Sequence, residues 1–265
     1  MKKLFHRCRP LLILAVFATL LISVPVMAKD KTVNVGKLKN GGYLDYEGTT
    51  QSHKFIYHRI NVPSDGAVGV IGIRVKNGSK YSIKAAMCDS KKARIDYYTN
   101  CTLFDSGDDN SMAQVYGLKK GVYYLRMQNN SPGSKYFVTF YYLKYSNGGA
   151  SKAKARSMSA GKKYSMLIGA GTSASTSAWY KLKVNGSRQV ILTVSTEGQG
   201  TFKIQITGSR MNQSDTIKAG QGFDFTLYGL KGSKKIALSA GTYYVKLSKS
   251  SKRTNGYAEL SWKYK

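Results

Sequence analysis

The stretch GVYYLRMQ, residues 121–128, returns 120 positions later as GTYYVKLS, residues 241–248. In both copies, apolar or aromatic side chains alternate with polar, aromatic or basic ones after a leading glycine. A period of two places the two sets on opposite faces of a β-strand. The chain therefore contains, twice, the pattern of a half-buried strand with one apolar face and one aromatic and basic face.

Two further segments recur in the same order on either side of this strand. Residues 58–75, HRINVPSDGAVGVIGIRV, are similar to residues 180–196, YKLKVNGSRQVILTVST. Residues 135–145, KYFVTFYYLKY, are similar to residues 256–265, GYAELSWKYK. An offset near 120 residues is the size of a small domain and too long for one unit of a solenoid. The repeat therefore predicts two copies of one module.

The sequence favours strands throughout both copies. Segments such as YKLKV and AELSWKY alternate with period two, and turn signals such as KNGS and VNGS separate the apolar runs. We therefore predict an all-β chain with two tandem antiparallel, jelly-roll-like β-sandwich domains. The expected organisation is a signal peptide at 1–28, a first sandwich at 29–147, a basic Gly, Ser and Lys linker at 148–157 that acts as a flexible tether, and a second sandwich at 158–265.

The N-terminal segment has the pattern of a secretory signal peptide. A basic start precedes the apolar run LLILAVFATLLISV, and Val26-Met27-Ala28 ends the segment with small residues at the spacing of a cleavage site. The alternative is a retained membrane anchor, because the run is about as long as the ~20 residues that span a bilayer. Pro25 and the Val-x-Ala ending favour cleavage. We expect a secreted, extracellular protein, either released or held non-covalently at the cell wall.

The chain is strongly basic. Its formal net charge is +29, and removal of residues 1–28, which hold four basic and no acidic residues, leaves +25. Such a charge attracts polyanions, which outside a cell include teichoic acids, acidic polysaccharides, anionic lipid headgroups and stray nucleic acid. Surplus lysine also simply keeps proteins soluble, so the net charge by itself specifies no partner.

Cys88 and Cys101 are the two cysteines that follow the signal segment. An even pair that closes a short loop in an exported chain predicts a disulfide. A catalytic cysteine is the alternative, but neither His53 nor His58 lies in a motif that supports a nucleophile.

Motifs of enzymes and of bound cofactors are not found in the sequence. It has no His-Glu-x-x-His, no Gly-x-Ser-x-Gly, no phosphate-binding glycine loop and no Cys/His spacing for zinc. The acidic stretch FDSGDDNS offers Asp105, Asp108 and Asp109 as oxygen ligands for weakly bound Ca²⁺, although the same residue types make ordinary surface turns. We expect neither an enzyme nor a tightly held cofactor.

The best candidates for ligand binding are Tyr124 and Arg126 in the first copy and Tyr244 and Lys246 in the second. All four lie on the outward face of the repeated strand. A tyrosine ring can stack on a sugar ring, and a neighbouring cation can bind a carboxylate or phosphate oxygen. The alternative is that they are ordinary solvent-facing strand residues, since tyrosine has a high strand propensity and Lys or Arg protects exposed sheets.

The order of these strands resembles the bacterial pre-peptidase C-terminal domain. A strand such as YKLKV, a small-residue turn, the strand VILTVST, the glycine-led strand GTYYVKL and a final Tyr-rich strand follow one another as in that family, once per half of the chain. The resemblance implies a fold similar to carbohydrate-binding jelly-roll modules and a role as an accessory or binding module. No peptidase domain precedes either copy, which departs from the usual setting of the family.

The sequence thus predicts a secreted, non-catalytic binding or accessory protein that recognises glycans or an anionic cell-wall polymer. Tandem copies would bind with avidity if the linker lets both engage. The alternative is a structural or protein-interaction component of an extracellular assembly. Specific recognition of nucleic acid is not expected, although weak salt-sensitive binding would follow from the charge.

Overall fold

The computed structural model describes residues 30–49, 55–76, 82–95, 101–104, 113–129, 135–145 and 147–265. The predicted signal peptide at 1–28 lies outside this part of the chain. Every regular element in the described residues is a β-strand, and most neighbouring strands pair antiparallel. This confirms the prediction of an all-β chain with β-sandwich domains. No helix in the described ranges is long and apolar enough to cross a membrane. Residues Lys31–Lys265 form one compact unit.

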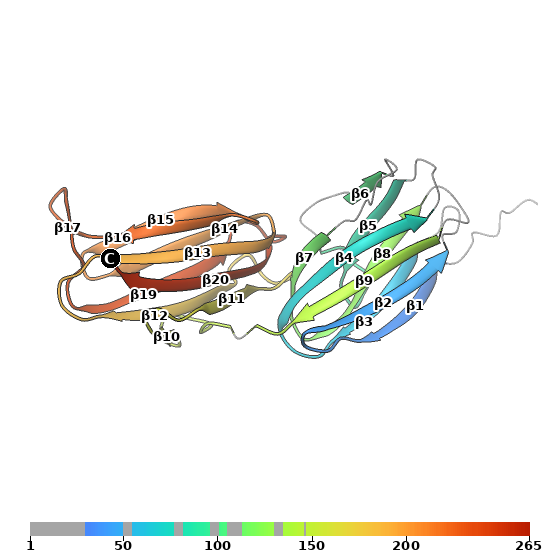
Figure 1. Ribbon diagram of the computed structural model, residues 1–265, viewed down its shortest axis with the longest axis horizontal. Coiled ribbons are helices and arrows are strands. Elements are labelled where there is room, and N and C mark those ends of the chain that lie inside the picture. The colour runs from blue at the N-terminus through green and yellow to red at the C-terminus, as the bar shows by residue number, and fades with distance from the viewer. Residues whose placement is uncertain are drawn as a thin grey trace, which may run out of the picture. The chain divides into compact units, whose positions relative to one another are not determined.

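The first sandwich is built from two sheets (Figure 1). In spatial order, the five-stranded sheet contains β1 (Lys31–Lys37), β3 (Ile56–Val62), β8 (Gly121–Asn129), β5 (Ser82–Cys88) and β6 (Cys101–Phe104). The four-stranded sheet contains β2 (Gly42–Thr49), β9 (Lys135–Leu143), β4 (Gly66–Lys76) and β7 (Ala113–Leu118).

The second sandwich repeats this topology. Its five-stranded sheet contains β10 (Arg156–Met158), β12 (Ser177–Val184), β19 (Gly241–Lys249), β14 (Thr201–Gly208) and β15 (Met211–Lys218). Its four-stranded sheet contains β11 (Tyr164–Ile168), β20 (Asn255–Tyr264), β13 (Val190–Gln199) and β16 (Gly222–Leu227). The spatial order is the same, strand for strand, as in the first sandwich, so the sequence repeat is a repeat of fold.

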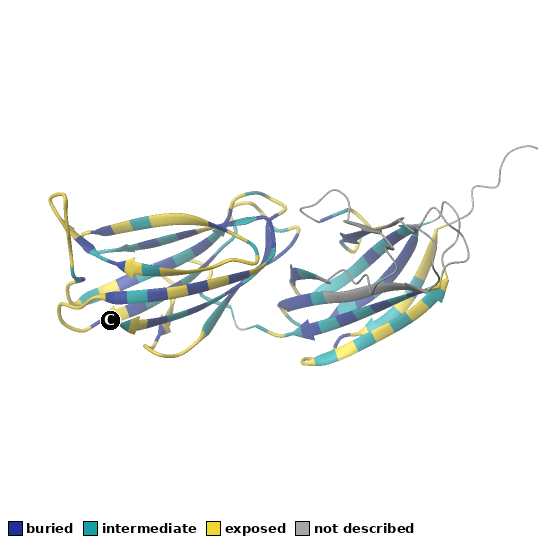
Figure 2. Cartoon of the chain, turned by 45° about the horizontal axis from the view of Figure 1, so that its top comes forward, coloured by how far each residue is buried: buried dark blue, intermediate teal, exposed yellow. Residues whose placement is uncertain are grey.

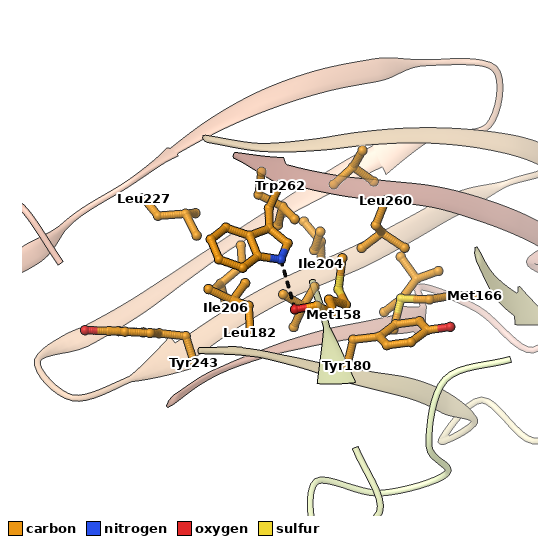
Figure 3. Packing of buried hydrophobic residues seen from close by; sticks show 14 of the residues in the cluster. Met158, Met166, Tyr180, Leu182, Ile204, Ile206, Leu227, Tyr243, Leu260 and Trp262 are labelled. Carbon is orange, nitrogen blue, oxygen red and sulfur yellow. Dashed lines mark hydrogen bonds between the residues drawn. The ribbon is translucent and has the colours of Figure 1, made fainter. Parts of the chain in front are cut away.

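Apolar side chains from the two sheets of each sandwich meet in its core. Along β20, Ala258, Leu260 and Trp262 are buried while the residues between them are more exposed, and Figure 2 shows this alternation on many strands. In the second core, Trp262 packs among residues of the facing sheet and its Nε1 donates a hydrogen bond to the carbonyl oxygen of Met158, at 3.2 Å (Figure 3). The indole can be buried because its one polar atom is satisfied.

One edge of each five-stranded sheet pairs in parallel, which the prediction of antiparallel sandwiches did not include. Strand β1 pairs parallel with β3, and β10 pairs parallel with β12. The strand between the two in sequence, β2 or β11, lies in the other sheet. The chain reverses direction on entering that sheet and again on leaving it, so the third strand returns parallel to the first.

The two sandwiches differ in the connection before the central glycine-led strand. Strands β7 and β8 are separated by only Lys119 and Lys120. The equivalent strands β16 and β19 are separated by a segment that contains the small hairpin of β17 (Gly229–Lys231) and β18 (Lys234–Ile236). The second sandwich therefore has a hairpin at a position where the first has a two-residue turn.

Part of the predicted linker is hydrogen-bonded to the second sandwich. The backbone of Gly149 exchanges two hydrogen bonds with that of Trp179 in β12, both at 2.8 Å. Just before it, the side chain of Asn147 accepts from the backbone N–H of Leu167 in β11, at 3.0 Å. These contacts attach the start of the 148–157 segment to two strands and shorten the stretch that could act as a free tether.

The glycine that leads each repeated strand has a backbone reason to be glycine. Gly121 has φ of 156° and Gly241 has φ of 158°, a region that residues with a Cβ rarely adopt. Each begins its strand opposite the last residue of the neighbouring strand, Val62 or Val184. The positive φ, and not a lack of space, requires glycine, because a Cβ at Gly241 would find its nearest side-chain atom at 3.9 Å.

Substitution of Gly241 by alanine should therefore destabilise the fold through the backbone alone. We expect Gly241→Ala to lower the free energy of unfolding by about 1–3 kcal/mol, the usual cost of such strained dihedrals. Denaturant unfolding monitored by tryptophan fluorescence measures the change. Gly222→Ala is the matched control, since Gly222 has no positive φ and its Cβ would meet only ordinary contacts. Equal stability of both variants would contradict the explanation.

A fully buried histidine lies in the core of the first sandwich. His58 Nδ1 donates to the carbonyl oxygen of Leu125, at 3.2 Å, and Nε2 accepts from the hydroxyl of Tyr136, at 2.8 Å. Burial lowers the pKa of His58 to about 4, against the opposing effect of the Leu125 hydrogen bond and with a smaller lowering by the charge of Lys31. The imidazole is therefore neutral in the folded protein at neutral pH.

The pKa of His58 makes stability depend on pH. Below the ordinary value of 6.5 the unfolded chain binds a proton that the folded chain does not bind until about pH 4, so stability falls as the pH falls through this window. Across the whole window, the lowered pKa of His58 reduces the free energy of unfolding by about 3 kcal/mol. In His58→Leu, unfolding free energies measured from pH 7 to pH 4 should decline less steeply than in the wild type. Parallel pH profiles would show that His58 does not cause the decline.

Candidate functional site

The four residues predicted to bind ligand point away from the two cores. In β8, Leu125 is buried while Tyr124 and Arg126 on either side of it are partly exposed. In β19, Val245 is buried between the partly exposed Tyr244 and Lys246. Both strands lie at the centre of their five-stranded sheet, so these side chains lie in the middle of its outer surface, which we call the outer face.

The strand beside each central strand adds a second aromatic residue and a second cation to the outer face. In the first sandwich, Tyr57 of β3 lies directly opposite Arg126, and Arg59 lies opposite Tyr124. Aromatic and cationic residues therefore alternate both along and across these strands.

The second sandwich has the same arrangement at the same register positions. Trp179 of β12 lies opposite Lys246, and Lys181 lies opposite Tyr244. The period-two pattern of YKLKV puts Lys181 on the outward side of its strand, but the sequence did not predict Lys181, Trp179, Tyr57 or Arg59 as site residues. The offset of 122 between residues 57 and 179 was the signal that could have found the aromatic pair.

Cations lie over the aromatic rings of the first outer face. Lys92 Nζ is 4.2 Å from the ring centroid of Tyr57 and 5.6 Å from that of Tyr124, and it also donates to Thr32 Oγ1 at 3.1 Å. Arg126 lies 4.7 Å from the ring centroid of Phe55. Tyr57 is only 7% exposed although its strand position faces outward. Electrostatic attraction between a cation and a ring face stabilises such contacts.

The second outer face uses different cations for the same purpose. Lys246 Nζ lies 5.3 Å from the ring centroid of Trp179, and Lys152 Nζ lies 4.8 Å from that of Tyr244. Lys152 belongs to the predicted linker, so this segment supplies a charge to the face. The indole Nε1 of Trp179 donates to Ser177 Oγ at 3.1 Å, which fixes the ring on the strand.

The outer faces carry positive charge without nearby negative charge on the same strands. Among the described residues of β3, β8 and β5, and of β12, β19 and β14, none is Asp or Glu. Such a surface attracts anions at low ionic strength and loses part of this attraction as salt screens it.

The register places the two cysteines apart. Cys101 in β6 pairs with Ala85 of β5, three residues before Cys88 in the same strand. Three residues of strand cover about 10 Å, whereas the Cα atoms of a disulfide lie about 4.4–6.8 Å apart. A bridge would thus require β6 to shift along β5, and the disulfide stays a prediction. Cys88 Sγ is buried and lies 3.9 Å from the carbonyl oxygen of Ala86.

The candidate calcium ligands Asp105, Asp108 and Asp109 lie outside the described residues. Within the described ranges, no three His, Cys, Asp or Glu side chains lie close enough together to hold a metal ion.

One lysine is buried instead of exposed. Lys249 ends β19, and its Nζ donates to the carbonyl oxygens of Thr172, at 3.2 Å, and Lys252, at 3.0 Å. Burial and, to a smaller extent, the charge of Lys119 together lower the pKa of Lys249 to about 8. Both of its contacts are to backbone carbonyls, so its role is to tie two loops of the second sandwich to the end of the central strand.

No family model and no curated protein matches this chain. Among solved structures, tripeptidyl peptidase 2 aligns over 86% of this chain with 11% identity and a TM-score of 0.31, and the chain spans 24% of that protein's length. The CUB1-EGF-CUB2 domains of rat MASP-1 align over 87% of this chain and 99% of their own, with 8% identity and a TM-score of 0.25.

A turret protein of Sulfolobus turreted icosahedral virus aligns over 84% of this chain and 98% of its own, with 12% identity and a TM-score of 0.20. Likenesses at these scores carry no argument about function.

Proposed function

We propose that the protein is a secreted, non-catalytic binding protein that holds an anionic glycan or cell-wall polymer on the outer faces of its two five-stranded sheets. The observation that carries the proposal is the repetition of the same face. Tyr124 and Arg126 with their neighbours in β3 have counterparts at the same register positions of β19 and β12. Cations bind carboxylate or phosphate oxygens through charge-assisted hydrogen bonds.

The net charge of residues 29–265 supports an anionic partner. The charge of +25 outside residues 1–28 would draw a polyanion toward the protein, and the outer faces would then hold it on strands whose described residues include no Asp or Glu. The signal-peptide pattern at 1–28 supports export, which brings the protein to the cell wall. The resemblance to pre-peptidase C-terminal domains supports an accessory role without chemistry of its own.

We propose for the aromatic residues a role other than stacking on a sugar ring. Since cations already lie over the rings of Tyr57, Tyr124, Trp179 and Tyr244, the rings hold the cations in place more than they offer a flat surface to a sugar. Recognition on this face depends mainly on charge, so it should weaken gradually with salt instead of surviving unchanged.

Removal of one central cation from each face tests the proposal. We expect the double variant Arg126→Gln, Lys246→Gln to lose about tenfold in retention on purified bacterial cell wall at low salt, because each lost charged hydrogen bond is worth ~1.5–3 kcal/mol before screening. Sedimentation with the insoluble wall, at low and high salt, measures the retained fraction.

The matched control is Lys39→Gln, Lys234→Gln, which removes the same charge from exposed positions outside the outer faces. The control should bind nearly as well as the wild type. If both double variants lose the same retention, binding reflects net charge alone and the outer faces are not the site.

A further inference from the structure

A third cation extends the charged pattern onto a third strand of the first sandwich. Lys84 of β5 pairs with Gln128 of β8, two residues beyond Arg126. Each step from Arg59 on β3 to Arg126 on β8, and from Arg126 to Lys84 on β5, therefore goes one strand across and two residues along the sheet. All three lie on the outer face, so they form one diagonal line.

The second sandwich contains the same diagonal. Lys203 of β14 pairs with Ser248 of β19, two residues beyond Lys246, and Lys181 lies one strand to the other side. Lys181, Lys246 and Lys203 thus occupy the three register positions of Arg59, Arg126 and Lys84. We call each set of three a cation line.

The charge is common to both cation lines although the residues and their neighbours differ. Arginine stands for lysine at two of the three positions. The other outward residues of β5 and β14 differ in type between the two copies. Ala86 occupies the register position of Gln205, and Cys88 occupies that of Thr207. What the two copies share on this face is the cation line and the aromatic residues beside it at equivalent register positions.

The spacing of the line indicates what it can bind. Two residues along a strand cover about 6.8 Å and neighbouring strands lie about 4.8 Å apart, so successive cations start from backbone positions roughly 8 Å apart. Three extended backbone bonds span about 3.5 Å, so successive phosphates of a glycerol phosphate chain, six bonds apart, lie about 7 Å from one another. Long lysine and arginine side chains easily take up the difference.

From this geometry we propose that each cation line binds a linear polyol phosphate chain, one phosphate to each cation, with the polymer running diagonally across the sheet. The inference rests on the proposed function and specifies its ligand. A polyol chain needs no aromatic platform, which suits faces whose rings already carry cations. A single-stranded nucleic acid has phosphates at a similar repeat but gains affinity from base stacking, for which these covered rings are poorly suited.

The test measures binding of soluble poly(glycerol phosphate) by titration calorimetry over a series of salt concentrations. The slope of log K against log salt counts released counterions, about 0.7 for each phosphate neutralised on a single strand. We expect the triple variant Lys181→Gln, Lys246→Gln, Lys203→Gln to lower the magnitude of the slope by about 2 for the line it removes, and affinity at low salt by at least about tenfold.

Two controls separate the line from total charge. The triple variant Lys231→Gln, Lys234→Gln, Lys265→Gln removes three exposed lysines elsewhere in the second sandwich and should leave the slope nearly unchanged. The double variant Lys203→Gln, Gln205→Lys keeps the charge on the same face but moves it directly beside Lys246, which breaks the spacing. It should weaken binding several-fold, and wild-type affinity in this variant would overturn the proposal.

Comparison probes distinguish failure of this inference from failure of the proposed function. Polygalacturonate carries carboxylates on sugar rings, and a single-stranded oligonucleotide carries phosphates with bases. Tighter binding of poly(glycerol phosphate) than of both, lost in the first triple variant, supports the inference. If the protein instead binds polygalacturonate or the oligonucleotide more tightly, and the same variant loses this binding, the inference is overturned but the outer face is still a binding surface. No binding to any probe overturns both.

Discussion

The alternation of side chains along the central strand of each five-stranded sheet is the constraint on which the rest of the structure depends. In β19, Tyr243, Val245 and Leu247 are fully buried in the core of the second sandwich. A shift of this strand by one residue would turn all three toward solvent, so burial holds the register against slippage. The same register decides which residues face outward. The hydrophobic core therefore positions the outward cations through the register of the strand.

This dependence explains which features could be predicted from the sequence. The all-β class, the repeat and the outward placement of Tyr124 and Tyr244 follow from local periodicity, which a single strand displays by itself. The parallel pairing of β1 with β3 could not be read in this way, because it depends on which sheet the intervening strand enters. The hairpin of β17 and β18 was also missed, since its strands are only three residues long.

The candidate site was predicted only in part, for a similar reason. Period-two reasoning identifies the outward residues of one strand but not their partners on the neighbouring strands, which depend on register. Period two puts Lys203 on the outward side of its own strand, but Lys84 and Lys203 join the site only because β5 and β14 pair with the central strands. The disulfide prediction shows the converse case, since proximity in sequence suggested a contact between Cys88 and Cys101 that the register of β6 does not bring together.

The glycine-led start of the central strand has a consequence for both parts of the molecule. Gly241 begins β19 with a positive φ, opposite Val184. This starting point sets which residues of β19 face the core and which face outward. A residue with a Cβ would resist this entry, and the strand would have to begin elsewhere. The recurrence of glycine at Gly121, with nearly the same φ, is thus a backbone requirement of the register and needs no functional explanation.

The linker connects the fold to the proposed binding face of the second sandwich. Trp179 holds Gly149 through two backbone hydrogen bonds and offers its ring to Lys246 through its side chain. Three residues after Gly149, Lys152 lies over Tyr244. In the first sandwich the corresponding cover comes from Lys92, in the loop after β5. The two copies thus reach one charged, aromatic face by different segments of chain, which is the expected result when the register of the sheet is common to both and the loops have diverged around it.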